Sequence, residues 1–143
     1  MATGIKVEVQ IDINSDPAKV WDALVNPEII KQYLFGTNTI TDWKVGSPIV
    51  FQGVWEGVEY KDKGTILEFI PEQKLKYDYW SSFSPLEDKP ENYQQITFML
   101  EKNGELTKLT LLQENINDET TKEHSEKNWI MILDQIKQLV EKN

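Results

Sequence analysis

The alternation of apolar and polar side chains near the start of the chain predicts a strand that leads directly into a capped helix. Between residues 5 and 13 every second side chain is apolar, and a period of two is typical of a strand with one buried face. The pattern then ends, and Ser15 or Asp16 can cap a helix whose first turn holds Pro17. Beyond it, apolar residues recur at helical spacing: Val20, Trp21, Leu24 and Val25.

The middle of the chain predicts one more short helix and then a run of antiparallel strands. The helix is expected over residues 28–33, before Gly36, and segment 81–91 has little periodicity and is expected to be a loop. Asn103-Gly104 between two alternating runs indicates a hairpin, and Gly64 is expected to bend a long strand. The expected strands are 39–43, 48–55, 58–70, 74–80, 93–101 and 106–114.

The last segment, residues 118–141, is predicted to be one long helix. Its second half carries an apolar stripe at steps of three and four residues: Trp129, Ile132, Leu133, Ile136, Leu139 and Val140. Its first half, 119–128, is nearly all polar. That half therefore either projects past the sheet or covers something other than dry core.

Together these elements predict an α+β fold. One long helix cannot cover both faces of a large sheet, so we expect a curved antiparallel sheet of about six to seven strands, wrapped around the C-terminal helix. The two short helices after the first strand would close one end. The chain has five Trp, five Tyr and five Phe, and these side chains either fill the space between helix and sheet or line it.

Composition and charge argue against several classes of binding partner. The formal net charge is -9, which argues against nucleic acid and anionic membrane surfaces, because both are bound through clustered Lys and Arg. The chain has no cysteine, which suits a cytoplasmic protein. No stretch approaches the roughly 20 apolar residues of a transmembrane helix, so no membrane insertion is expected. At 143 residues the chain is expected to form one domain, residues 1–143.

Seven short motifs occur in a consistent order along almost the whole chain. They are D-P-A-K-V-W-D-A-L-V-N-P-E at 16–28, Y-L-F-G at 33–36, D-W-K-V-G-S-P-I at 42–49, W-E-G-V-E-Y-K-D-K-G at 55–64, L-K-Y-D-Y-W at 75–80, P-E-N-Y at 90–93 and W-I-M-I-L-D-Q-I-K at 129–137. In this order they resemble the family named for the C-terminal half of the activator of heat-shock protein 90 ATPase, within the START/birch-pollen-allergen (SRPBCC) helix-grip superfamily. The resemblance implies a hydrophobic cavity between the sheet and the long helix.

Aromatic and apolar residues of separate elements are the candidate binding site. The helix-grip topology would bring them to one concavity, although plain core packing is the alternative for each. Leu34 and Phe35 are expected near an entrance, and loop 81–91 is a candidate lid. The expected cavity-lining residues are Leu34, Phe35, Trp43, Trp55, Tyr77, Tyr79, Phe98, Trp129 and Leu133.

The sequence carries no signal for catalysis, a metal or a cofactor. His124 is the only histidine; it is offset from the apolar stripe of the last helix and is expected to be solvated. The orientation of Glu114 is less certain. On its strand, the side chains that point inward could instead be those of Leu109, Leu111 and Gln113, and Glu114 would then point outward. The other strand carboxylates are expected on the solvent face: Glu8, Asp12, Glu68 and Asp78.

Three functions of different classes follow. The first is non-catalytic binding of a small hydrophobic or aromatic molecule, or a lipid, in the cavity. The second is a stress-related co-chaperone of heat-shock protein 90 that acts through its surface. The third is a cyclase- or hydrolase-like enzyme that uses the same cavity. It needs a positioned acid or base, so His124 or Glu114 pointing inward would favour it and an all-apolar lining would remove it.

Overall fold

One antiparallel sheet organises the structure. The computed structural model describes residues 4–81 and 86–142, apart from the side chain of Trp55. Its elements in chain order are β1 (Val7–Ile13), α1 (Pro17–Val25), α2 (Pro27–Tyr33), β2 (Asn38–Ile40), β3 (Pro48–Trp55), β4 (Val58–Ile70), β5 (Lys74–Tyr79), η1 (Pro90–Asn92), β6 (Gln94–Asn103), β7 (Leu106–Glu114) and α3 (Glu119–Lys142). The seven strands of this part of the chain lie in the order β1-β7-β6-β5-β4-β3-β2.

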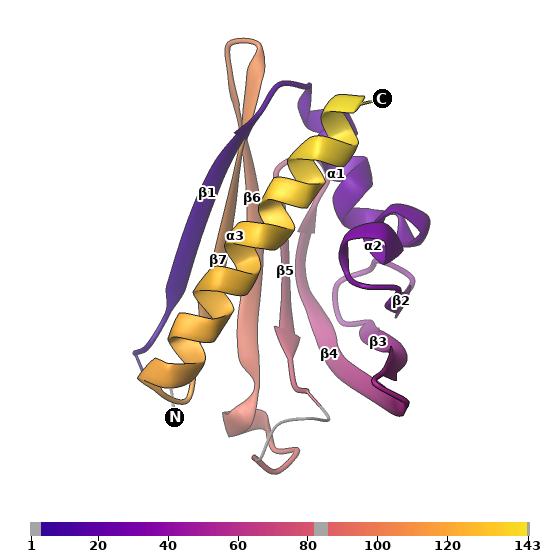
Figure 1. Cartoon of the computed structure of the whole chain (residues 1–143), viewed down its shortest axis with the longest axis vertical. Helices are drawn as coiled ribbons and strands as arrows, with labels where there is room; N and C mark the ends of the chain where they lie inside the picture. Colours follow the sequence, from indigo (N-terminus) through magenta and orange to yellow (C-terminus); the bar gives the residue numbers. More distant parts are fainter. Residues whose placement is uncertain (1–3, 82–85, 143) are drawn as a thin grey trace.

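The long helix α3 lies across one face of the curved sheet, and α1 and α2 pack beside its C-terminal half (Figure 1). The buried positions of α3 are Ile132, Leu133, Ile136 and Val140. They join the side chains of α1, α2 and the inner face of the strands in one hydrophobic core. The predicted α+β helix-grip fold, with its curved sheet and two short helices after the first strand, is therefore confirmed.

The first two helices are set by their caps. The Asp16 carboxylate accepts a hydrogen bond from the Lys19 N–H at 2.9 Å, which fixes the start of α1. Asn26 both ends α1 and begins α2, since its side chain accepts from the Glu28 N–H at 3.1 Å. Helix α2 starts at Pro27, one residue earlier than predicted. The predicted strand-to-helix junction is confirmed, and Trp21 packs edge-to-face on Phe69 with ring centroids 5.3 Å apart.

The region of β2 and the loop after β5 differ more from the prediction than the other elements do. Strand β2 ends at Ile40 rather than continuing to residue 43, because Trp43 has a positive φ of 60° that a strand does not accommodate. The loop after β5 contains the short helix η1 before Tyr93. Residues 82–85 of the expected lid lie outside the described residues.

Strand β4 changes partners along its length. It pairs with β3 up to Thr65 and with β5 from Ile66, and the register shifts between Ile66 and Glu68. Near this change, a Cβ on Gly64 would lie 1.7 Å from the backbone oxygen of Asp78. The bend expected at Gly64 is thus a site where two strand backbones approach closely, and the irregular register falls two residues later.

Asp78 lies on the outer face of the sheet, opposite Gln95 in register and between the inward Tyr77 and Tyr79, but it is less exposed than expected. Its carboxylate is half-buried and accepts a hydrogen bond from the Thr65 N–H at 2.6 Å. Burial raises the pKa of Asp78 above its ordinary value, although the bond from Thr65 acts in the opposite direction. None of the described helices is long and apolar enough to cross a membrane.

Candidate functional site

A cavity of about 630 Å³ lies between the sheet and the N-terminal half of α3. The loop after α2, strands β3 to β7 and α3 all contribute to its wall. From α3, the polar side chains of Thr121, Ser125 and Asn128 line it. Of the two alternatives left open by the sequence, the polar first half of the last helix therefore covers something other than dry core, namely this cavity, and does not simply project past the sheet.

The wall of this cavity is rich in aromatic side chains. They are Phe35, Phe51, Tyr60, Tyr77, Tyr79 and Trp129. The ring of Phe51 lies 5.6 Å from that of Tyr77 and 5.9 Å from that of Tyr79, centroid to centroid. Aromatic pairs prefer such inclined arrangements to parallel face-to-face stacking. Phe35 is 56 % exposed, as expected for a residue at the entrance.

Not all of the nine residues that were expected to line the cavity do so. Five of them line the cavity: Leu34, Phe35, Tyr77, Tyr79 and Trp129. Trp43 and Phe98 reach only an adjoining space of about 20 Å³, room for about one water molecule. The side chain of Trp55 lies outside the described part of the structure. Ligand binding by any of these residues stays a prediction.

Leu133 is a core residue and not part of the cavity wall. It is fully buried within the hydrophobic cluster, whereas its neighbour Ile132 lines the cavity. Successive helical residues point about 100° apart at 3.6 residues per turn, so only one side of the apolar stripe faces the cavity. The stripe alone does not show which side that is.

Asp62 is a buried carboxylate on the cavity wall that the sequence analysis did not single out. It is opposite Phe51 in the β3–β4 register, so both side chains lie on the inner face of the sheet. The Tyr79 hydroxyl donates a hydrogen bond to Asp62 at 2.6 Å. Burial and then the negative charge of Asp62 raise the pKa of Tyr79 well above its ordinary value. The alternation of β4 places Tyr60 and Asp62 on one face of the strand, but it does not show that this face is the inner one.

One buried hydroxyl group near the inner wall, that of Thr39, differs from its neighbours. The Tyr77 side chain, which lines the cavity, is only 6 % exposed. Burial raises the pKa of Tyr77 above its usual range. Thr39 Oγ1 is buried without a hydrogen-bond partner in the described part of the chain. Tyr33, by contrast, donates to the Ala23 carbonyl at 2.8 Å.

A chain of side-chain hydrogen bonds holds the floor of the cavity. Trp129 Nε1 donates to Gln113 Oε1 at 2.7 Å, and Gln113 Nε2 donates to Gln94 Oε1 at 2.5 Å. Gln113 is buried and belongs to the inward set with Leu109 and Leu111 that the sequence left open. These bonds fix the orientation of the indole against the wall.

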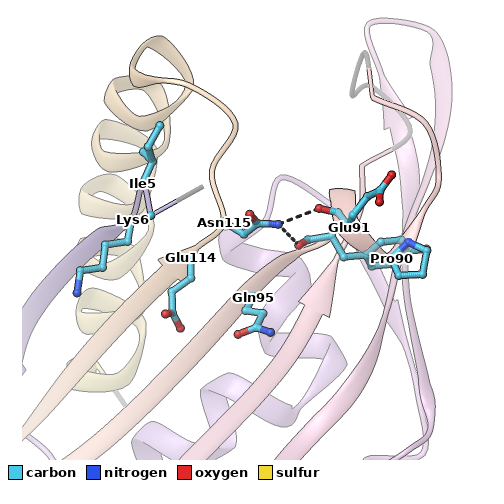
Figure 2. Close-up of a pocket in the computed structure, with 9 residues that line it drawn as sticks. Ile5, Lys6, Pro90, Glu91, Gln95, Glu114 and Asn115 are labelled. Atoms are coloured by element: carbon cyan, nitrogen blue, oxygen red, sulfur yellow. Dashed lines mark hydrogen bonds between the residues drawn. The ribbon is translucent and has the colours of Figure 1, made fainter. Parts of the chain in front are cut away.

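A second, polar pocket of about 440 Å³ lies on the opposite face of the sheet (Figure 2). Glu114 and Gln95 are paired in register there, and the Asn115 amide donates to the backbone oxygens of Glu91 and Tyr93 at 3.1 and 2.9 Å. Glu114 therefore faces away from the aromatic cavity.

His124 is exposed on α3 and does not line the aromatic cavity. The described lining residues of the cavity include the carboxylates of Asp62 and Asp118 and no Lys, Arg or His. Asp118 lies at the start of α3, where its Oδ1 accepts from the Thr121 N–H at 2.7 Å. That bond lowers the pKa of Asp118. The cavity thus combines an apolar, aromatic interior with a few fixed polar groups, an arrangement that binds small molecules in many proteins.

Comparison with known proteins gives a consistent result. The model of the family described as Activator of Hsp90 ATPase homolog 1-like protein matches residues 14–141. The solution structure of ChR145 from Cytophaga hutchinsonii is 42 % identical and covers 99 % of this chain and 97 % of its own, with a TM-score of 0.86. No curated protein matches the sequence.

Two more distant structures share the fold. The Aha1 dimer from Colwellia psychrerythraea is 19 % identical over 95 % of this chain and 96 % of its own, with a TM-score of 0.75. PFC0360w, an HSP90 activator from Plasmodium falciparum, is 18 % identical over 96 % of both chains, with a TM-score of 0.75. Since the family model spans nearly the whole chain, the protein belongs to the family of Activator of Hsp90 ATPase homolog 1-like proteins.

Proposed function

We propose that this protein binds a small hydrophobic or aromatic molecule, or a lipid, in the aromatic cavity without chemical conversion. The observation that carries the proposal is the cavity of about 630 Å³ whose wall holds six aromatic rings, that of Tyr77 with its hydroxyl among them. Small-molecule sites are concave, mostly apolar spaces of about 300–1,000 Å³ with a few oriented polar groups. An amphipathic ligand would place its apolar part against the rings.

The polar side of α3 supports an amphipathic ligand. Thr121, Ser125 and Asn128 face the cavity from the helix, opposite the aromatic strands. A ligand polar at one end can exchange hydrogen bonds with these side chains while its apolar part contacts Phe51 and Tyr79. We also propose that the protein is cytoplasmic, as expected from the sequence.

A thermal-unfolding screen tests this function. A ligand that binds only the native state stabilises it by about 2.7 kcal/mol at a hundred times its Kd. We expect lipids or aromatic compounds in such a screen to raise the Tm in a concentration-dependent way. The positive compounds are then measured by calorimetry.

Two variants of neighbouring helix residues show whether binding uses the cavity. Ser125→Tyr places a large side chain into the cavity, whereas Glu126→Tyr adds the same side chain at an exposed position that does not line it. We expect Ser125→Tyr to lose binding and Glu126→Tyr to keep it. No thermal shift with any compound, or equal binding by both variants, would contradict the proposal.

A second candidate function is co-chaperone activity through the surface. Exposed large apolar side chains concentrate between residues 35 and 58: Phe35, Ile40, Val45, Val54 and Val58. Contiguous exposed apolar surface often marks a protein interface, and the family is named for an activator of Hsp90 ATPase. A pull-down with a bacterial-type heat-shock protein 90 and an ATPase assay test this candidate, and no complex at micromolar concentration would contradict it.

The enzyme alternative has less support. His124 or Glu114 pointing into the cavity would have favoured it, and neither residue lines the cavity. Asp62 is the buried carboxylate at that wall, and the Tyr79 hydroxyl donates to it. Unchanged ligand recovered after prolonged incubation would agree with binding alone, whereas a product that depends on Asp62 would favour the enzyme.

A further inference from the structure

A small space adjoins the aromatic cavity on the side of α2, and we call it the inner subsite. Four residues line both spaces: Leu34, Phe51, Tyr77 and Trp129. The inner subsite has a volume of about 20 Å³, which suits one water molecule or one hydroxyl group and is too small for a ring. A ligand in the aromatic cavity can therefore enter the inner subsite only with one small group.

Thr39 brings a hydroxyl to the wall of the inner subsite that the fold itself does not need. It is the middle residue of β2 and lies opposite Phe51 in register, so both side chains point to the inner face of the sheet. Thr39 is 5 % exposed, and its Oγ1 has no hydrogen-bond partner among the described residues. Valine would fill nearly the same volume without burying an unpaired oxygen. The hydroxyl can therefore bond a ligand without breaking a bond of the fold.

Two other polar groups of the inner subsite already have hydrogen-bond partners. The Tyr33 hydroxyl donates to the Ala23 carbonyl at 2.8 Å, and the Trp129 indole N–H donates to Gln113 at 2.7 Å. The described lining residues carry no charged side chain, so a buried ammonium or carboxylate group would find no opposite charge in this wall. A neutral hydroxyl fits, since it can donate to Thr39 Oγ1 or accept from it.

From these contacts we propose that the protein binds a neutral aromatic molecule whose ring carries a hydroxyl group, and that this hydroxyl enters the inner subsite and bonds Thr39 Oγ1. The ring itself lies in the aromatic cavity against Phe51 and Tyr77, which line both spaces. The inference rests on the proposed function, because it names the chemical class of the ligand that the same cavity binds.

Two probes that share one ring system test the proposal: 2-naphthol and 2-methylnaphthalene. Both are uncharged at neutral pH, and the hydroxyl of one is nearly as large as the methyl group of the other. Their dissociation constants are measured by heteronuclear NMR titration of the unaltered protein and of Thr39→Val. We expect Thr39→Val to bind 2-naphthol about threefold to tenfold more weakly, because one hydrogen bond is lost. It should bind 2-methylnaphthalene at least as tightly as the unaltered protein does.

Thr107→Val is the matched control for this substitution. It also removes a buried threonine hydroxyl, but that hydroxyl donates to the Ser15 carbonyl, and Thr107 lines neither the aromatic cavity nor the inner subsite. We expect Thr107→Val to bind both probes as tightly as the unaltered protein.

Methyl signals of two isoleucines show where the hydroxyl lies. Ile49 lines the inner subsite and not the aromatic cavity, whereas Ile132 lines the aromatic cavity and not the inner subsite. We expect 2-naphthol to move the methyl signals of both residues in the unaltered protein. Movement of the Ile132 signal while that of Ile49 stays in place would overturn the inference.

The outcomes separate this inference from the proposed function. Equal weakening of both probes by Thr39→Val, or no weakening of 2-naphthol, would overturn the role of the Thr39 hydroxyl and leave ligand binding standing. If 2-naphthol does not bind the unaltered protein while other compounds of the thermal screen raise the Tm, this inference alone fails. If no compound raises the Tm and neither probe binds, the proposed function fails with it.

Discussion

At the scale of single residues, the inner wall contains one polar group that the fold itself does not use. Thr39 Oγ1 is buried without a partner among the described residues. Thr107 Oγ1, by contrast, donates to the Ser15 carbonyl at 2.7 Å. A buried polar atom without a partner costs about 1–3 kcal/mol, so the Thr39 hydroxyl is expected to reduce stability or to serve binding.

Replacing Thr39 distinguishes a costly hydroxyl from a useful one. Thr39→Val keeps the branched shape and removes the unpaired oxygen, so we expect the free energy of unfolding to rise by about 1 kcal/mol. Thr107→Val is the matched control, because it removes a hydroxyl that is bonded and fully buried, and it should lower stability by about 1 kcal/mol. Urea unfolding of both variants checks this, and a loss of stability in Thr39→Val would show that its oxygen is satisfied in solution.

Replacing Tyr77 separates binding from folding in another way. Tyr77→Phe keeps the ring that packs on Phe51 and removes only the hydroxyl. We expect the free energy of unfolding to change by less than about 1 kcal/mol, while the affinity for the compound that raises the Tm most in the thermal screen falls about threefold to tenfold. Calorimetry at one temperature measures the affinity. An unaltered affinity would remove Tyr77 from the binding site.

At the scale of elements, α3 and β4 determine where the cavity lies. The C-terminal half of α3 is anchored in the core through Leu133 and Ile136, and its N-terminal half lines the cavity with polar side chains. Strand β4 passes from β3 to β5, and its alternation directs Tyr60 and Asp62 inward. The close approach of β4 and β5 at Gly64 holds this part of the wall together.

Gly64 is therefore expected to be intolerant of a side chain. Gly64→Ala would place its Cβ 1.7 Å from the backbone oxygen of Asp78, so the two strands must separate, and we expect a loss of at least about 3 kcal/mol of stability. In Gly53→Ala the nearest atom is the Tyr60 hydroxyl at 2.8 Å, the end of a side chain that can move. Chemical unfolding should show the smaller loss for Gly53→Ala, and equal losses would contradict the account of this strand pair.

The helices and strands also show how much of the fold and of the cavity could be predicted from the sequence. The strand-to-helix junction before Val20, the hairpin at Gly104 and the stripe on α3 follow from local patterns, and the structure contains all of them. The cavity wall could be anticipated only in part, because the choice between Ile132 and Leu133 depends on how α3 rotates against the sheet. The inward position of Asp62 depends on the pairing of β4 with β3, which alternation alone leaves unassigned.

At the scale of the whole molecule, buried tyrosines link stability to alkaline pH. The pKa values of Tyr33, Tyr77 and Tyr79 are raised by burial, and that of Tyr93 is raised to about 12 by burial and by Asp88. The unfolded chain releases these protons near pH 10 while the native state keeps them. Stability is therefore complete below about pH 10 and falls as the pH rises above it.

Tyr77→Phe measures how much Tyr77 contributes to the loss of stability at alkaline pH. Each buried tyrosine contributes up to about 1.4 kcal/mol per pH unit above the pKa of the unfolded chain. We expect the decline in unfolding free energy between about pH 10 and 11 to be shallower in Tyr77→Phe by up to that amount. Identical declines in the two proteins would mean that Tyr77 titrates normally in the native state.

The central claim, that a small molecule binds between the sheet and the N-terminal half of α3, is tested most directly by the indole N–H signals in a heteronuclear NMR titration. The titrant is the compound that raises the Tm most, and the signals are assigned with Trp→Phe variants. Trp129 lines the cavity and donates to Gln113 at 2.7 Å, whereas Trp80 donates to the Leu86 carbonyl at 3.2 Å outside the cavity wall. We expect the Trp129 signal to move and saturate with the calorimetric Kd while the Trp80 signal stays in place. A compound that binds without moving the Trp129 signal would contradict the claim.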